Sequence, residues 1–282
     1  MARPRRSLTY ERGWRRASLA SRVKTGAKEA LKRPVEMLGF EVGRQTTPRG
    51  LNDPWLAQQR LLGPVRRPVI FDVGANMGQT LENYAAVFPQ ATIHSFEPFP
   101  ESYGHLEVTA SRYPSAVPHR LALADTAGER TFFVNPEWHT RNSLLPRPSE
   151  RRRYYRAGSD LAPSLTVQTE TLDAFCSRHS VDRIDILKLD VQGAEGMVLR
   201  GAKGLLSREA IDLVFTEVMF VPHYEGGPLF HQLWGQLEEH RYSFFNLFDM
   251  TVASNGQLRY ANALFLSSGT RARVVDAFPN EP

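Results

Sequence analysis

The most informative polar residues of this chain are acidic, and they stand where buried strands are expected to end. This set comprises Asp72, Glu97, Asp125, Asp190 and Glu217. In an open α/β sheet, ligands bind outside the carboxyl ends of the parallel strands. We therefore expect these carboxylates to gather at one binding site, and their joint placement is a stronger signal than any single motif.

A turn with two glycines follows the first expected strand, and it reads Asp72-Val-Gly-Ala-Asn-Met-Gly78. Glycines let the backbone approach a ligand closely. The turn lacks the glycine spacing of dinucleotide-binding folds and the Gly-Lys-Ser/Thr of a phosphate-binding loop, which disfavours nicotinamide, flavin and nucleotide triphosphate ligands. Asp72 suits a cationic sulfonium or amino group, while backbone N–H groups would take a carboxylate. A tight turn without a ligand is the alternative.

Glu97 and Asp125 are the next two candidates along the chain. A carboxylate that ends the second strand can accept hydrogen bonds from both hydroxyls of a ribose. Alternatively, Glu97 is an acid favoured by the dipole of the following helix. Asp125 would lie near an adenine amino group, or it is a plain turn residue before Gly128.

The second informative motif is Lys188-Leu-Asp-Val-Gln-Gly193. Asp190 can accept a proton from a substrate hydroxyl, or hold a metal that acidifies that hydroxyl. Lys188 and Asp190 alternate along a strand and face the same side, so their charges would interact, although a purely structural pair is the alternative. Glu217 could join Asp190 around a hard cation, but two carboxylates are a weak metal signal, so a divalent metal stays open.

Alternating strands and helices must position these residues. The expected strands are 69–72, 91–96, 116–124, 131–134, 165–168, 184–189, 211–216, 242–248 and 260–266, and the expected helices are 55–62, 78–88, 101–112, 171–177, 194–206 and 228–240. This alternation predicts a doubly wound sheet. The last two strands have no helix between them and must pair antiparallel. The predicted fold is therefore α/β, with a seven-stranded, mostly parallel, Rossmann-like sheet and an antiparallel last strand.

Charge divides the chain into two regions. The 282 residues carry a net charge of +5, but residues 1–33 hold eleven Lys and Arg against two Glu, so the rest is acidic by −4. A basic arm can bind nucleic acid, anionic lipid or an acidic partner, or it is a solvated extension. We expect a basic N-terminal extension at 1–67, partly helical or irregular, and one α/β domain at 68–282.

Composition also bears on the cellular compartment. No apolar run approaches the roughly 20 residues that span a bilayer, and no apolar region follows the basic N-terminus as in a secretory signal. The single cysteine, Cys176, permits no internal disulfide. We expect a cytoplasmic protein, and peripheral membrane contact through the basic N-terminus stays open.

Several ordered motifs resemble the FkbM family of methyltransferases. They are residues 69–78, 95–98, 171–173, 187–195, 198–202 and 215–218. The resemblance runs from about 68 to 248, and it implies a class I methyltransferase fold at 68–282, S-adenosylmethionine as methyl donor, and O-methylation of a sugar, polyketide or related small-molecule or glycan acceptor. By motif, the cofactor-binding residues would be Asp72, Gly74, Asn76, Gly78, Glu97 and Asp125.

The same resemblance places Asp190 next to the transferred methyl group, as the catalytic residue. The family often carries Glu where this chain has Gln192, and a neutral amide cannot act as a base, so the catalytic assignment shifts to Asp190. The basic N-terminal arm and the Arg- and Tyr-rich stretch 141–156 lie outside the specific motifs, and we expect these two regions to recognise the acceptor.

Two alternatives remain. The first is an N-methyltransferase or a nucleic-acid-directed methyltransferase of the same fold. The Asn/Asp-Pro-Pro-Tyr/Phe/Trp signature of many such enzymes is absent after the fourth core strand, which disfavours a nucleic-acid acceptor. The second is a non-catalytic S-adenosylmethionine-binding protein, against which the intact acidic strand ends argue. Three single histidines remain as further candidate bases: His94, His139 and His223.

Overall fold

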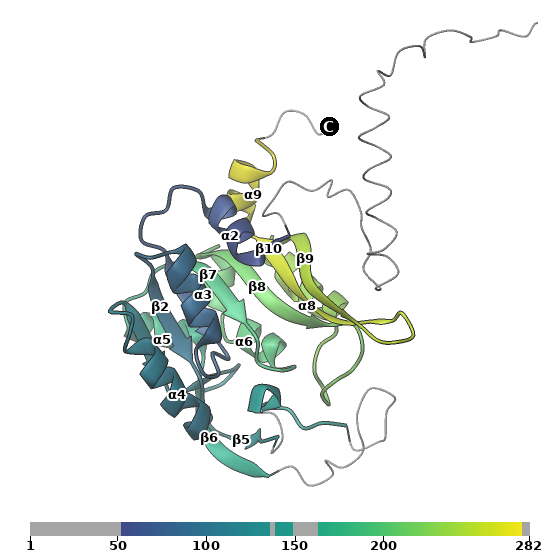
Figure 1. Ribbon diagram of the computed structural model, residues 1–282. Helices are drawn as coiled ribbons and strands as arrows, with labels where there is room; N and C mark the ends of the chain where they lie inside the picture. The colour runs from purple at the N-terminus through teal and green to yellow at the C-terminus, as the bar shows by residue number, and fades with distance from the viewer. Residues whose placement is uncertain (1–51, 136–138, 149–162, 278–282) are drawn as a thin grey trace, which may run out of the picture. The chain divides into compact units, whose positions relative to one another are not determined.

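The computed structural model describes residues 52–135, 139–148 and 163–277 (Figure 1). Residues 49–282 form one compact unit. The basic residues 1–33 lie outside the described residues, as do residues 149–156 of the Arg- and Tyr-rich stretch. In the described part of the chain, no helix is long and apolar enough to cross a membrane.

Seven strands form the central sheet, in the order β3-β2-β1-β7-β8-β10-β9. They are β1 (Val69–Val73), β2 (Thr92–Phe96), β3 (Ala116–His119), β7 (Ile184–Leu189), β8 (Ile211–Met219), β9 (Ser243–Val252) and β10 (Leu258–Leu266). The pairs among the first five are parallel, whereas β10 runs antiparallel to β8 and β9. The predicted sheet is confirmed, and its last strand lies between β8 and β9.

Helices cover both faces of this sheet. They are α2 (Pro54–Leu62), α3 (Gln79–Val87), α4 (Pro100–Ala110), α5 (Leu172–Arg178), α6 (Glu195–Arg200), α7 (Lys203–Ser207), α8 (Phe230–Glu238) and α9 (Ser268–Val274). Successive residues of a strand point to opposite faces. Accordingly, Ile70 packs in one core with residues of α2, α3 and α4, while Phe71 packs in the other with residues of α5 to α8.

A second, three-stranded sheet lies beside the first in the order β4-β6-β5, and its strands are β4 (Ala122–Leu123), β5 (Gly128–Phe133) and β6 (Ser164–Glu170). The prediction of a single strand at 116–124 is therefore wrong. The chain turns where Leu121 N donates to His119 O (3.0 Å), and the residues beyond this turn pair with β6 instead of β2. Asp125 consequently follows a strand of the small sheet.

The helix expected at 194–206 is divided into α6 and α7. Gly201 stands at the break, and its carbonyl accepts a hydrogen bond from Asp173 N (3.0 Å). A Cβ atom at Gly201 would lie 2.0 Å from the Ala124 carbonyl oxygen, so the backbones touch there. The Gly201 carbonyl thus accepts from Asp173 and does not continue the hydrogen bonds of an α-helix.

Helix α2 lies within the predicted N-terminal extension, yet it packs on the domain. Ala57 and Leu61 are buried in the core that contains Ile70. The Gln58 side chain accepts a hydrogen bond from the Tyr84 hydroxyl (2.9 Å). The folded unit thus begins before residue 68. Neither α9 nor the short 3-10 turn η1 (His139–Arg141) was predicted.

Candidate active site

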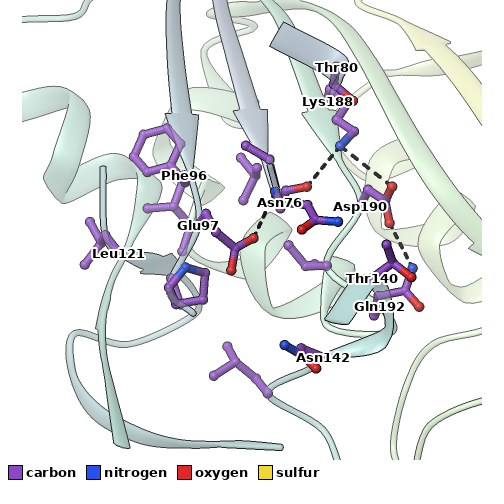
Figure 2. Close-up of a pocket in the computed structure, with 18 of the residues that line it drawn as sticks. Asn76, Thr80, Phe96, Glu97, Leu121, Thr140, Asn142, Lys188, Asp190 and Gln192 are labelled. Carbon is purple, nitrogen blue, oxygen red and sulfur yellow. Dashed lines mark hydrogen bonds and ion pairs between the residues drawn. The ribbon is translucent and has the colours of Figure 1, made fainter. Parts of the chain in front are cut away.

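A cavity of about 240 Å³ opens at the carboxyl ends of β1, β2 and β7 (Figure 2). This is the position at which open α/β sheets bind ligands. Its polar wall includes Asn76, Thr80, Glu97, Lys188, Asp190 and Gln192, and its apolar wall includes Phe96, Leu121, Leu123, Phe132 and Leu144. The sequence-predicted acids Glu97 and Asp190 therefore meet at one site.

The two glycines of the first turn are required by contacts within the protein. Gly74 has φ +82°, and a Cβ atom there would lie 1.9 Å from the Asp190 carbonyl oxygen. Gly78 has φ +97°, and its Cβ would lie 2.8 Å from Thr109 Cγ2. Both positions favour glycine for conformation as well as for space. We expected glycine at position 74 because the backbone approaches a ligand there. The structure adds a second reason, which is the close approach of the ends of β1 and β7.

Glu97 is held by the backbone of two loops. Its Oε2 accepts a hydrogen bond from Asn76 N (2.9 Å), and its Oε1 accepts one from Phe99 N (2.8 Å). The residue is 7% exposed. Burial raises the pKa of Glu97 to about 7, although the two backbone hydrogen bonds oppose that effect. Figure 2 shows this carboxylate pointing toward Asn76.

Asp72 is completely buried and forms an ion pair with Lys188. The distance from Lys188 Nζ to Asp72 Oδ1 is 3.0 Å, and to Asp190 Oδ2 it is 3.7 Å. Lys188 Nζ also lies 3.3 Å from the Gly74 carbonyl oxygen, to which it donates. Burial would lower the pKa of Lys188, but the carboxylates of Asp72 and Asp190 outweigh it and raise that pKa.

This pair changes the interpretation of the first strand end. Within the described residues, Lys188 belongs to the cavity wall and Asp72 does not. The geometry therefore gives Asp72 a positioning role, because its carboxylate holds the lysine ammonium. Direct contact between Asp72 and a cationic ligand stays a prediction.

Asp190 is the most accessible acid of the cavity wall, with a side chain that is 40% exposed. Gln192 Nε2 donates to Asp190 Oδ1 (2.9 Å) and to Glu217 Oε2 (2.8 Å). The Tyr224 hydroxyl donates in turn to Gln192 Oε1 (2.7 Å). Burial raises the pKa of Glu217 well above its ordinary value. One neutral amide thus joins two acids and a phenol.

Sequence reasoning treated Gln192 only as a lost base. The signal that it missed is the type of residue: an amide has two N–H donors, and here two carboxylates use them. The amide stands between Asp190 and Glu217, where we had considered a shared cation. Among the described residues, no group of three or more His, Cys, Asp or Glu is arranged to hold a metal ion.

Asp125 is engaged in two ion pairs. Its Oδ1 lies 2.6 Å from Arg130 Nη2, and its Oδ2 lies 3.0 Å from Arg200 Nη2. In the part of the chain that the structure describes, Asp125 does not belong to the cavity wall, whereas Leu121 and Leu123 do. The residues that precede Asp125 therefore reach the site, whereas the Asp125 carboxylate joins the end of β4 to β5 and α6.

Within the described residues, neither His94 nor His223 belongs to the cavity wall. His94 Nδ1 lies 3.1 Å from His119 Nε2, and these half-buried rings stack, with His94 beside Phe71. The side chain of His139 lies outside the described residues. His223 is half-buried, and its ring lies edge-on to Tyr260 at 5.8 Å between centroids.

Three relatives that match part of this chain in sequence are methyltransferases. It is 27% identical over 165 residues to 2-O-methyltransferase NoeI of Sinorhizobium fredii, covering 56% of this chain and 66% of that protein. It is 26% identical over 152 residues to hexuronic acid methyltransferase AglP of Haloferax volcanii, covering 53% and 55%. It is 25% identical over 154 residues to 31-O-demethyl-FK506 methyltransferase FkbM of Streptomyces tacrolimicus, covering 48% and 59%. In each case the match spans less than two thirds of the relative.

A solved structure and a family model complete the comparison. Magnesium protoporphyrin IX methyltransferase of Synechocystis PCC 6803 aligns over 91% of this chain and 87% of its own, with 10% identity and a TM-score of 0.41. Residues 72–244 match the methyltransferase FkbM domain, which is more than half of the chain. The chain therefore belongs to the FkbM family of methyltransferases.

Proposed function

We propose that this protein transfers a methyl group from S-adenosylmethionine to a hydroxyl group of a sugar, polyketide or related small-molecule or glycan acceptor. The observation that carries the proposal is one cavity with two kinds of acid in its wall. Glu97 is buried and fixed by backbone hydrogen bonds, while Asp190 is accessible. The names of two relatives, 2-O-methyltransferase NoeI and 31-O-demethyl-FK506 methyltransferase FkbM, support transfer to oxygen.

The residues of the cavity fit this methyl donor. Asn76 Oδ1 is buried in the wall and finds no hydrogen-bond partner among the described residues, so it offers an acceptor to a ligand amino or hydroxyl group. Glu97 would hold the ribose hydroxyls, since each carboxylate oxygen can accept more than one hydrogen bond. Leu121, Leu123 and Phe132 offer an apolar surface to the adenine ring. When bound, S-adenosylmethionine supplies an electrophilic methyl group on a sulfonium.

Asp190 would accept the proton that the acceptor hydroxyl loses. Its carboxylate is oriented by Gln192 on one oxygen and lies near Lys188 on the other. Two fixed neighbours restrict its rotation, and a well-positioned group of this kind contributes about 10² to 10⁴ in rate. Glu217 is a poorer candidate for this role, because among the described residues it is outside the cavity wall and its Oε2 accepts from the Gln192 amide.

The test separates cofactor binding from turnover. We expect Asp190→Asn to bind S-adenosylhomocysteine within about twofold of the wild-type affinity and to lose about 100-fold or more in methyl transfer. Calorimetry measures the first quantity, and mass spectrometry of acceptor pools measures the second. The control is Asp276→Asn, an exposed acid after α9 whose loss leaves both unchanged. Full turnover by Asp190→Asn would refute the catalytic role, and a folded wild-type protein that binds no S-adenosylhomocysteine would refute the function.

A further inference from the structure

A short pairing of two extended segments forms part of the cavity wall. Phe133 N donates to the Ser143 carbonyl oxygen (2.8 Å), and Ser143 N donates to the Phe133 carbonyl oxygen (3.1 Å), so these residues form an isolated antiparallel bridge. Successive side chains of such a segment point to opposite faces. Asn142 and Leu144, on either side of Ser143, therefore share a face, and both line the cavity. The Ser143 hydroxyl donates to the Gln192 carbonyl oxygen (2.7 Å), which ties this segment to the loop after β7.

The face that carries Asn142 also carries the apolar wall of the cavity. Phe132 precedes the bridge, so in an antiparallel register it stands opposite Leu144. These two side chains belong to one hydrophobic cluster. They line the cavity together with Leu121 and Leu123. Asn142 is thus a polar side chain beside the apolar surface that we assign to the adenine ring.

The backbone after β5 fixes the orientation of the Asn142 amide. Asn135 N donates to Asn142 Oδ1 (2.7 Å). Because a backbone N–H can only donate, the amide oxygen faces Asn135 and the amide nitrogen is left for another partner. Asn142 is 8% exposed, and its Nδ2 atom is buried without a hydrogen-bond partner among the described residues. Figure 2 shows this side chain in the cavity wall. Buried donors are seldom left unpaired in proteins, so this amide is suited to a ligand atom that accepts a hydrogen bond.

The residue that we expected near the adenine ring, Asp125, is engaged elsewhere. Its carboxylate pairs with Arg130 and Arg200, and within the described part of the chain it does not line the cavity. Apolar side chains offer contact area to a base but read none of its polar atoms. Adenine presents ring nitrogens that accept hydrogen bonds. Of the described residues in the wall, Asn142 alone has a buried side-chain nitrogen without a partner.

We propose that Asn142 Nδ2 donates a hydrogen bond to a ring nitrogen of the adenine of S-adenosylmethionine, and that Asn142 thereby recognises the base. This inference rests on the proposed function, because it assumes that methyl donor. A site built to hydrogen-bond a ligand group rejects an analogue that lacks the group, since the buried polar atom of the protein is then left unpaired. Asn142 would therefore read the base, while Glu97 holds the ribose.

The experiment replaces one ring nitrogen of the ligand at a time. S-adenosylhomocysteine and its 1-deaza, 3-deaza and 7-deaza analogues, each with a C–H group in place of one nitrogen, are titrated into the full chain by calorimetry. We expect the wild-type protein to bind at least one analogue about tenfold more weakly than S-adenosylhomocysteine, because that analogue leaves Asn142 Nδ2 unpaired. Equal binding of all four ligands overturns the inference.

Two variants test whether Asn142 is the donor. Asn142→Leu has a similar size and no donor, so we expect about tenfold weaker binding of S-adenosylhomocysteine and loss of the discrimination against one analogue, which identifies the nitrogen. Asn142→Asp keeps an oxygen for Asn135 N and replaces the donor by an acceptor, so the same losses are expected from it if Asn142→Leu does not fold.

The matched control is Asn255→Leu, in the hairpin between β9 and β10. Asn255 is exposed, and its Oδ1 also accepts a backbone N–H, from Gln257 (3.2 Å). This control should keep the wild-type affinity and the wild-type discrimination.

The outcomes separate this inference from the proposed function. A folded Asn142 variant that binds S-adenosylhomocysteine as tightly as the wild-type protein, or that keeps every discrimination among the analogues, overturns the role of Asn142. The proposed function survives that result, because the wild-type protein still binds the ligand. A folded wild-type protein that binds no S-adenosylhomocysteine refutes the proposed function, and this inference with it.

Discussion

The affinity for S-adenosylhomocysteine should depend on pH through Glu97. This carboxylate has a pKa of about 7 because it is buried in the cavity wall. If the ribose hydroxyls donate to Glu97, the ligand prefers the ionised form, and bound ligand lowers that pKa. In the protein without ligand, Glu97 is mostly ionised at pH 8 and about one tenth ionised at pH 6. Apparent affinity should therefore fall about tenfold from pH 8 to pH 6, which corresponds to about 1.4 kcal/mol.

Calorimetry in buffers of different ionisation enthalpy measures both the affinity and the protons released. Near pH 7 we expect the release of about half a proton per ligand bound. Glu97→Gln should bind more weakly at pH 8 and lose the pH dependence. The matched control is Glu195→Gln, because burial also raises the pKa of Glu195 to about 7 although this residue is not in the cavity wall. A flat pH profile in the wild-type protein, or a profile abolished by the control, would show that Glu97 does not bind the ribose.

Two further predictions concern the stability of the site. Lys188→Met should destabilise the protein by about 3–5 kcal/mol in urea unfolding, because it leaves Asp72 buried without its counter-ion. The double variant Lys188→Met/Asp72→Asn should recover part of that loss. Equal stability of the single and double variants would contradict the pairing. Gly74→Ala should cost about 3 kcal/mol or more, since its Cβ would meet the Asp190 carbonyl oxygen at 1.9 Å, whereas Gly104→Ala, which has open space, should be neutral or stabilising by thermal melting.

The fold could be predicted where short buried strands end at acids. The runs that became β1 and β7 are apolar and β-branched, and both are buried in the sheet. The separation of β3 from β4 could not be predicted, because the run 116–124 is apolar on both sides of the turn at His119. Periodicity reports burial, and it does not report which sheet a strand joins.

The site divides in the same way. Glu97 and Asp190 were placed correctly at one cavity, because both follow parallel strands of the same sheet. The partner of Asp72 was not predicted, since it depends on register: Asp72 lies opposite Lys188 across β1 and β7, which are more than a hundred residues apart in sequence. Asp125 was drawn into the set by its position in the sequence alone, and its two arginine partners come from β5 and α6.

Gln192 shows how a departure from a family pattern can be part of a site. A glutamate in its place would put a third carboxylate in contact with Asp190 and Glu217, and it would have no N–H group to donate to either. The amide supplies both donors, and its oxygen accepts from Tyr224, so every polar atom of the side chain that faces this network has a partner. The same side chain therefore orients Asp190 toward the cavity and, through Tyr224, connects it to the loop after β8. Residue 192 is thus a positioning residue that joins the proposed proton acceptor to Glu217 and Tyr224.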